Sequence, residues 1–191
     1  VSGGCLPDSA GPVHPSVFHN ALRAQAMHAK VIEQDFRVPD ERQLELARLA
    51  TKHAAVDGQN ATPIAGVSLM GASSTSQGLP ALYEPCLGIV LQGRKQAVLR
   101  RETYIYDPLN YLVVSVTLPV NGHILEASPQ RPYLSLRISI DTTVIADLLS
   151  QLPELKTQDD EVDRGLFVAR TSDEMLDAVL RLMRLIESPR D

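Results

Sequence analysis

The chain has 191 residues, of which 44% are hydrophobic and 21% charged, and its formal charge at pH 7 is -5. This length suits one domain with some trailing material, and the composition is typical of a globular protein without a membrane span. The net negative charge argues against a broad nucleic-acid-binding surface on this chain, because phosphate contacts require clustered Lys and Arg.

The N-terminal part is expected to be an extension, residues 1–38, that is flexible at first and weakly helical from Ser16 to Phe36. It lacks a basic segment followed by an apolar one, so nothing there resembles an export signal. Cys5 and Cys86 are far apart in segments of unlike character, which indicates a reducing cytoplasm rather than a disulfide framework.

A capping box opens the first clear helix. Asp40 precedes Gln43 by three residues, so each side chain is placed to bond the other's backbone N–H. The helix is predicted from about Glu41 to Val56, and Gly58 is placed to end it with a positive φ.

Short runs rich in Val, Ile, Leu and Tyr then fill residues 62–141, each broken by Gly, Pro, Asn or Asp. Spacing of about ten residues favours an antiparallel sandwich or barrel, and connections too short for helical crossovers argue against a parallel sheet. The seven predicted strands are 66–71, 86–92, 96–99, 103–106, 111–116, 120–126 and 133–140.

The last of these strands alternates strictly between apolar and more polar side chains, which predicts one buried face. The apolar face holds Leu134, Leu136, Ile138 and Ile140, and the other face holds Tyr133, Ser135, Arg137 and Ser139.

Two helices and one short strand are expected after the barrel. Asp141 is placed to cap a helix over about 142–152, and residues 165–169 form the strand. Thr171 and Glu174 form a second capping box for a helix over about 172–188. Apolar side chains cover more than half of that helix, so we expect it to be buried on more than one side.

Several ordered motifs together resemble the N-terminal domain of AraC-type bacterial transcriptional regulators, over about residues 44–191. The motifs are Tyr83-Glu84-Pro85-Cys86 through Gln92-Gly93-Arg94-Lys95, Tyr104-Ile105-Tyr106-Asp107, Tyr111 through Val116 with Leu118-Pro119-Val120, and Ala127-Ser128-Pro129 with Pro132 through Arg137. Residues 100–102 and 108–110 depart from the family pattern, because relatives typically have a glycine in each of these turns. The departures affect hairpin geometry rather than the overall fold.

The resemblance implies a mainly β fold with flanking helices (α+β) in a sensory domain over residues 39–191. Its centre is a cupin-like antiparallel β-barrel or jelly roll at about 62–141, accompanied by a C-terminal helical pair. It also implies a helix-turn-helix domain beyond residue 191, through which alone the protein contacts DNA.

A metal-dependent cupin enzyme, such as an isomerase or dioxygenase, is the main alternative. Such an enzyme needs two His and a Glu close together plus a third His, whereas the barrel region contains only His123. Glu126 lies three residues later, on the opposite face of a regular strand. Without a nucleophile elbow or a phosphate-binding glycine motif, we expect no enzyme activity, no metal and no cofactor. Cys86 is interpreted as a small buried hydrophobe.

A small barrel can instead enclose a ligand pocket with a few placed polar groups. Arg137 either pairs with Glu84 or Glu126 or binds an anionic group, and pairing is favoured. Each tyrosine has core or rim packing as its alternative role. The candidate ligand-binding residues are Tyr83, Gln92, Tyr104, Tyr106, Tyr111, His123, Tyr133 and Arg137.

We therefore expect an effector-sensing and dimerising domain of a transcriptional regulator, with a small molecule and a second copy as partners and no membrane contact. An oligomerisation module without a ligand is a further alternative. The last helix is the candidate dimer or coupling surface, through Met175, Val179, Leu182, Met183 and Ile186.

Overall fold

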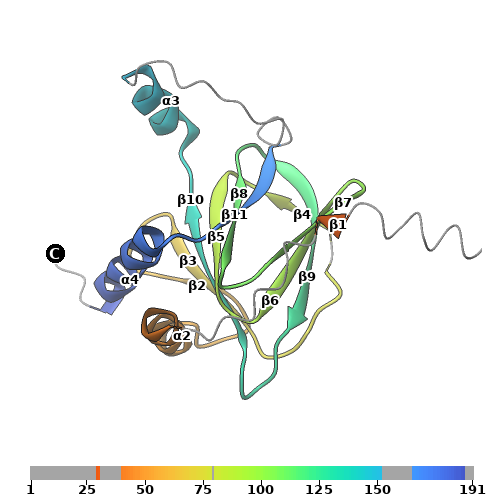
Figure 1. Cartoon of the computed structure of the whole chain (residues 1–191), viewed down its shortest axis with the longest axis vertical. Coiled ribbons are helices and arrows are strands. Elements are labelled where there is room, and N and C mark those ends of the chain that lie inside the picture. Colours follow the sequence, from red (N-terminus) through yellow and green to blue (C-terminus); the bar gives the residue numbers. More distant parts are fainter. Residues whose placement is uncertain (1–28, 31–39, 79, 152–164, 188–191) are drawn as a thin grey trace, which may run out of the picture.

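A computed structural model describes residues 29–30, 40–78, 80–151 and 165–187. Two β-sheets enclose a common interior, and helices cover the outer face of one of them (Figure 1). The predicted fold class, mainly β with flanking helices, is confirmed. No helix in the described part of the chain is long and apolar enough to cross a lipid bilayer.

The two sheets have five and six strands. The first has the order β1 (Ala29–Lys30), β7 (Glu102–Tyr106), β6 (Arg94–Leu99), β9 (Leu118–Glu126) and β4 (Pro80–Tyr83). The second has the order β11 (Leu166–Arg170), β8 (Asn110–Val114), β5 (Cys86–Gln92), β10 (Tyr133–Ser139), β3 (Val67–Ala72) and β2 (Gly58–Ala61). Every strand pair is antiparallel except β1 with β7, among the residues described.

All seven predicted barrel strands and the strand near residue 165 are present, with ends shifted by at most two residues. Three strands were not predicted. β2 and β4 are short edge strands that carry Gly, Asn or Pro and show no apolar alternation, so sequence patterns do not reveal them. β1 lies in the extension that was expected to be weakly helical, where a parallel pairing with β7 makes it a strand.

The predicted capping box is confirmed at the start of α2 (Glu41–His53). Asp40 accepts a bond from the Gln43 backbone N–H, and the Gln43 side chain accepts one from the Asp40 N–H. The predicted helix end at Val56 is wrong, because the Asn60 side chain bonds both the N–H and the carbonyl of Val56 and holds a turn there. Gly58 has the expected positive φ but begins β2.

The predicted capping box of α4 (Asp173–Glu187) is also corrected. Ser172 is the capping residue, since its hydroxyl accepts a bond from the Met175 N–H at 3.3 Å. Thr171 lies one residue too early and donates its own backbone N–H to the Leu109 carbonyl.

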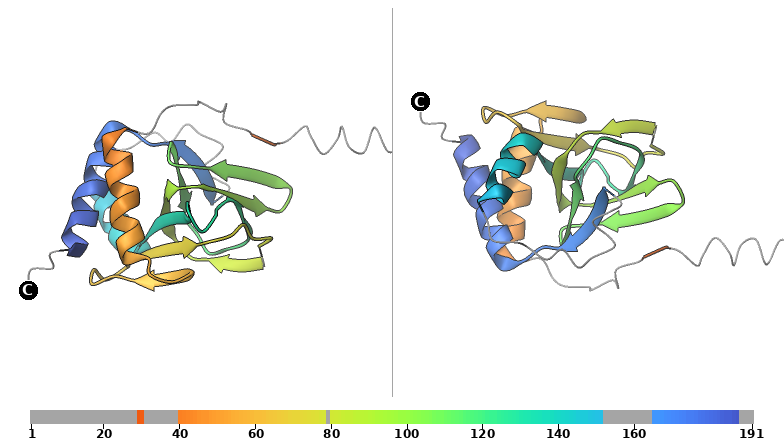
Figure 2. Two further views of the ribbon diagram at one scale, coloured as in Figure 1. Left: turned by 90° about the horizontal axis from the view of Figure 1, so that it is seen from below. Right: turned by 90° about the horizontal axis from the view of Figure 1, so that it is seen from above.

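The helix after the barrel, α3 (Thr142–Ser150), begins as predicted, with the Asp141 carboxylate accepting a bond from the Thr143 N–H. It stands away from the barrel (Figure 1). It therefore does not pair with α4, which lies beside α2 instead in both views of Figure 2.

Charged and apolar contacts fasten α4 to α2. Arg42 reaches Asp173 at 2.6 Å and Asp177 at 3.1 Å, and Arg184 makes two bonds of 2.9 Å with Glu45. Beneath them, buried side chains of both helices meet the outer face of β3, β5 and β10 in one apolar cluster. The helix layer, α2 and α4, thus covers the outer face of the six-stranded sheet, and the barrel interior lies on the other side of that sheet.

The turn between β6 and β7 shows how the chain forms a hairpin without the usual glycine. Arg100 adopts a φ of 57°, the one positive φ among the described residues other than glycine. A side chain is uncommon in this conformation, so Arg100 gives the turn a backbone geometry that glycine usually supplies, and the hairpin forms without a glycine.

Candidate ligand pocket

Strand β10 separates the helix layer from the barrel interior. Leu134 and Leu136 pack in the cluster beneath the helices, whereas Tyr133 belongs to the core inside the barrel. Ser135 and Arg137, on the same face as Tyr133, line a pocket in that interior. The alternating pattern was predicted to mean one buried face. In the structure both faces are enclosed from Tyr133 to Leu136, and the more polar face points into the barrel.

The pocket has a volume of about 790 Å³ and lies between the two sheets. Its walls come from strands β2 to β10 and from the segment 76–78, so distant parts of the sequence meet there. Pockets of roughly 300–1,000 Å³ typically hold drug-sized molecules. Its apolar lining includes Met70, Leu82, Leu112 and Ile124, and its polar lining includes Ser68, Tyr83, Lys95, Tyr106, Tyr133, Ser135 and Arg137.

Lys95 places a cation in this pocket. Its Nζ lies 5.6 Å from the centre of the Tyr83 ring and 5.8 Å from that of Tyr133, and its other close polar contact is the Met70 sulfur at 3.8 Å. Burial opposes the charged form, but the oxygens of Tyr133 and Tyr83 outweigh burial and raise the pKa of Lys95. The ammonium is therefore protonated at neutral pH.

The tyrosines supply hydroxyl groups and aromatic faces. Burial raises the pKa of both Tyr106 and Tyr133, so these phenols are neutral at physiological pH and can donate a hydrogen bond. Tyr83 is partly exposed and lies on β4, in the same five-stranded sheet as Tyr106, whereas Tyr133 lies on β10 of the six-stranded sheet. An aromatic or aliphatic ligand would find apolar ring faces beside a positive charge.

Gly122 on β9 makes room for this arrangement. A Cβ at this position would lie 2.4 Å from the Tyr83 hydroxyl oxygen and 3.2 Å from Lys95 Cε. A distance of 2.4 Å is shorter than any normal contact, so a larger residue would displace Tyr83. Glycine thus lets both side chains lie against the strand.

The rim of the pocket carries an ion pair. Arg137 Nη2 lies 3.4 Å from the Glu84 carboxylate, and Arg137 also donates to the Ser139 hydroxyl at 3.1 Å. The predicted structural pairing of Arg137 is confirmed with Glu84. Glu126, the other predicted partner, pairs with Arg94 at 3.3 Å.

Cys86 is buried in the barrel core as predicted. Burial raises the pKa of its thiol, although Arg137 and Lys95 nearby oppose that rise. A raised pKa favours the protonated thiol, which is a poor nucleophile compared with the thiolate.

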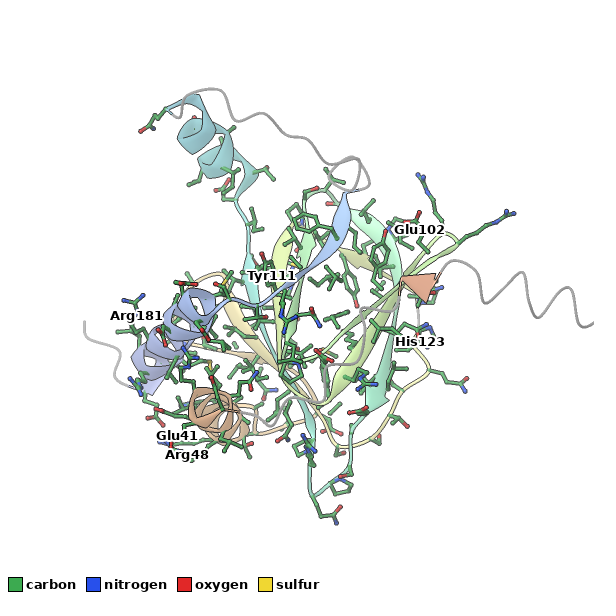
Figure 3. All side chains as sticks on the ribbon, viewed as in Figure 1. Glu41, Arg48, Glu102, Tyr111, His123 and Arg181 are labelled. Atoms are coloured by element: carbon green, nitrogen blue, oxygen red, sulfur yellow. The ribbon has the colours of Figure 1, made fainter. Side chains whose placement is uncertain are left out.

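Four of the eight predicted ligand residues line the pocket: Tyr83, Tyr106, Tyr133 and Arg137. The others do not, for four different reasons. The Gln92 side chain donates to the Pro132 carbonyl at 2.8 Å, and Tyr104 donates to Glu102. Tyr111 packs in the cluster beneath the helices, and His123 accepts a bond from the Gly78 N–H at 3.1 Å. Figure 3 labels these last two on opposite sides of the barrel interior.

Sequence reasoning missed Lys95, although a signal for it exists. Lys95, Ala97 and Leu99 alternate along β6, and the last two are buried in the barrel core. The same period of two therefore places Lys95 inside the barrel. It was overlooked because the strand was expected to begin at residue 96.

The predicted dimer residues of α4 also need correction. Val179, Met183 and Ile186 are buried against α2 and the sheet of the same chain, and Met175 and Leu182 are partly buried there. The helix has one buried face rather than two, because its exposed positions up to residue 185, namely 173, 174, 177, 178, 181, 184 and 185, recur about once per turn on the opposite face. The large apolar side chain that α4 leaves exposed is Leu185.

Metal-binding side chains are not grouped in the parts of the chain that the structure describes: no three His, Cys, Asp or Glu residues there are placed to share an ion.

Comparison with known proteins places these features in a family context. A protein-family model described as "AraC-type transcriptional regulator N-terminus" matches residues 63–191. An apo variant of ToxT from Vibrio cholerae aligns with a TM-score of 0.48 and 7% identity, over 69% of this chain and 50% of that chain. Wild-type ToxT with a bound unsaturated fatty acid aligns with a TM-score of 0.44 and 10% identity, over 70% and 48%.

A cupin protein from Bacteroides fragilis aligns with a TM-score of 0.29 and 16% identity, over 58% of this chain and 81% of that one. This chain spans about half the length of the ToxT chains that it matches. A search of curated proteins returned no match.

Proposed function

Since this chain belongs to the AraC-type transcriptional regulators, as an N-terminal domain of that family, we propose that its barrel binds a small-molecule effector in the pocket between the two sheets. The observation that supports this most directly is the pocket itself, about 790 Å³ with apolar walls and a few placed polar groups. A ligand-free oligomerisation module would not need such a space, because natural barrels of this size are otherwise filled by side chains.

In this proposal the effector changes the population of two arrangements of the domain and thereby alters DNA binding by a helix-turn-helix domain of the full-length regulator. A ligand can shift such an equilibrium only by the difference between its affinities for the two arrangements. Neither enzyme activity nor a cofactor has a part in this mechanism, in which the domain acts in the cytoplasm.

The test is a thermal-shift screen of the chain against a metabolite library, repeated with Ser135→Phe. A ligand that binds the native state alone raises stability by mass action, by about 2.7 kcal/mol at one hundred times its Kd. Ser135 is buried and lines the pocket, so a phenyl ring there fills the ligand's space. We expect hits that stabilise the parent chain and have no effect on a folded Ser135→Phe variant. Hits that stabilise both equally bind elsewhere, and a screen without hits counts against the proposal.

We also propose that the domain forms a homodimer, as a regulator that binds paired DNA half-sites would require. Leu185 is the position of α4 to test, because it is 57% exposed and outside the buried face of the helix. Sedimentation equilibrium should show a dimer that Leu185→Glu weakens while leaving the far-ultraviolet circular dichroism unchanged. An unchanged dimer would exclude α4 from the contact.

A further inference from the structure

The charge of the pocket indicates which class of effector it accepts, on the premise that the proposed sensing function holds. We infer that the effector is a monoanion, a carboxylate on an apolar body, and that Lys95 binds the carboxylate group.

Two cations line the pocket, and only one of them has a carboxylate partner. Arg137 pairs with Glu84 at the rim. No Asp or Glu among the described residues lies within 4.0 Å of Lys95 Nζ, and Glu84 is the single carboxylate in the described lining. The pocket therefore carries one uncompensated positive charge, which a single negative charge on the ligand balances.

A neutral ligand would leave Lys95 in an unfavourable state. When a ligand fills the pocket it displaces the water that solvates the ammonium, and a buried charge without a partner is strongly unfavourable. A carboxylate replaces the lost solvation with a charge-assisted hydrogen bond. A cationic ligand would add repulsion to the same cost. The pocket thus favours anions by both attraction and exclusion.

The surface around Lys95 sets the rest of the ligand. The ammonium lies at similar distances from the centres of the Tyr83 and Tyr133 rings, 5.6 and 5.8 Å, close enough for both rings to attract it. Met70, Leu112 and Ile124 continue the lining with apolar groups. A doubly charged phosphate would need a second unpaired cation, which the described lining does not hold. A carboxylate needs only Lys95, and an aromatic or aliphatic body attached to it would contact the tyrosine rings and the apolar side chains.

Matched acids and amides test this inference directly. We choose decanoate, 4-phenylbutyrate and 1-naphthylacetate, each with its primary amide, and measure binding at pH 7 by calorimetry and thermal shift. At least one acid should bind the parent chain ten times more tightly than its amide. Lys95→Met should weaken that acid by roughly tenfold to a hundredfold, the usual effect of losing a hydrogen bond to a charged group. The amide should not be weakened, because the variant has no ammonium for a neutral ligand to desolvate, so the preference for the acid should disappear.

Three further variants make the result specific. Lys95→Arg keeps the positive charge and should retain the preference for the acid. Lys52→Met is the matched control, because Lys52 is 65% exposed on α2 and pairs with Glu187 outside the pocket. Should Lys95→Met fail to give a folded circular dichroism spectrum, Lys95→Gln takes its place.

The outcomes separate this inference from the proposed function. Amides that bind as tightly as their acids, library hits that are neutral or cationic, or a Lys95→Met variant that keeps the acid preference would each overturn the anion site and leave effector sensing in place. Failure of all six probes together with an empty library screen would overturn both.

Discussion

Shortening a buried side chain of α4 should cost far more stability than shortening an exposed one two residues away. Met183 is 0% exposed in the cluster shared by α2, α4 and the six-stranded sheet, whereas Leu185 is 57% exposed. Met183→Ala removes three buried heavy atoms and leaves a cavity beneath the helix. Leu185→Ala removes a similar volume from a surface that is already in contact with water.

The expected loss for Met183→Ala is about 2–5 kcal/mol, the range for large-to-small changes at buried sites. Leu185→Ala should change the stability of the monomer by less than about 0.5 kcal/mol. A domain of this size loses roughly 2–4 °C of melting temperature per kcal/mol, so the first variant should melt at least about 4 °C lower. Urea unfolding followed by circular dichroism measures both free energies, and the denaturation slope shows whether the unfolded states are comparable.

Protein concentration separates packing within one chain from packing between chains. If Met183 is buried against its own α2, the difference between parent and Met183→Ala is the same at two concentrations roughly tenfold apart. Equal losses for Met183→Ala and Leu185→Ala, or a Met183→Ala loss that depends on concentration, would refute the placement of α4 in the intramolecular core.

Two other variants probe the pocket and the helix start. Gly122→Ala should lower the affinity of a pocket ligand at least severalfold with a small effect on folding, because the new Cβ displaces the flexible end of Tyr83 rather than backbone; unchanged affinity in calorimetry would place the ligand elsewhere. Asp40→Ala should cost about 0.5–2 kcal/mol at pH 7 through loss of the helix cap. Burial opposes ionisation of Asp40, but the Gln43 N–H and the Arg42 guanidinium outweigh it and lower its pKa below 3.8. The cap contribution is therefore complete above the ordinary pKa and lost as pH falls through the lowered one. A parent-to-variant difference that stays constant down to pH 2 in urea unfolding would contradict this.

The regular elements were predictable wherever local chemistry determines them. The box of Asp40 and Gln43 satisfies backbone groups three residues apart, so the sequence alone located the start of α2. The end of α2 depended on Asn60, whose side chain reaches back to Val56 from the next strand. Asn60 lies beyond the predicted end of the helix, so the apolar pattern within the helix did not reveal this contact.

Half of the predicted ligand-binding residues line the pocket. The type of a residue indicates that it could bind a ligand, but only the orientation of its strand decides whether its side chain faces the pocket. Tyr104 and Tyr106 are the same residue two positions apart on β7, yet one bonds Glu102 and the other lines the pocket. Tyr111 was predicted to face the barrel but lies beneath the helices, since β8 directs Leu112 inward instead. Both outcomes depend on how the two sheets are placed against each other, which a single sequence does not specify.

The alternation of β10 acquires a different meaning from this placement. A face with Ser, Arg and Tyr normally indicates solvent, but here it points to a space between two sheets, and the leucine face meets the helix layer. A shift of this strand that improves contact with a ligand on one face must also change packing on the other, because neighbouring side chains share one backbone. Close-packed interiors resist such a shift unless a second arrangement exists. β10 thus borders the pocket on one face and the cluster beneath α2 and α4 on the other, as β3 and β5 do, and under the proposed function these three strands would connect an effector to the helix pair.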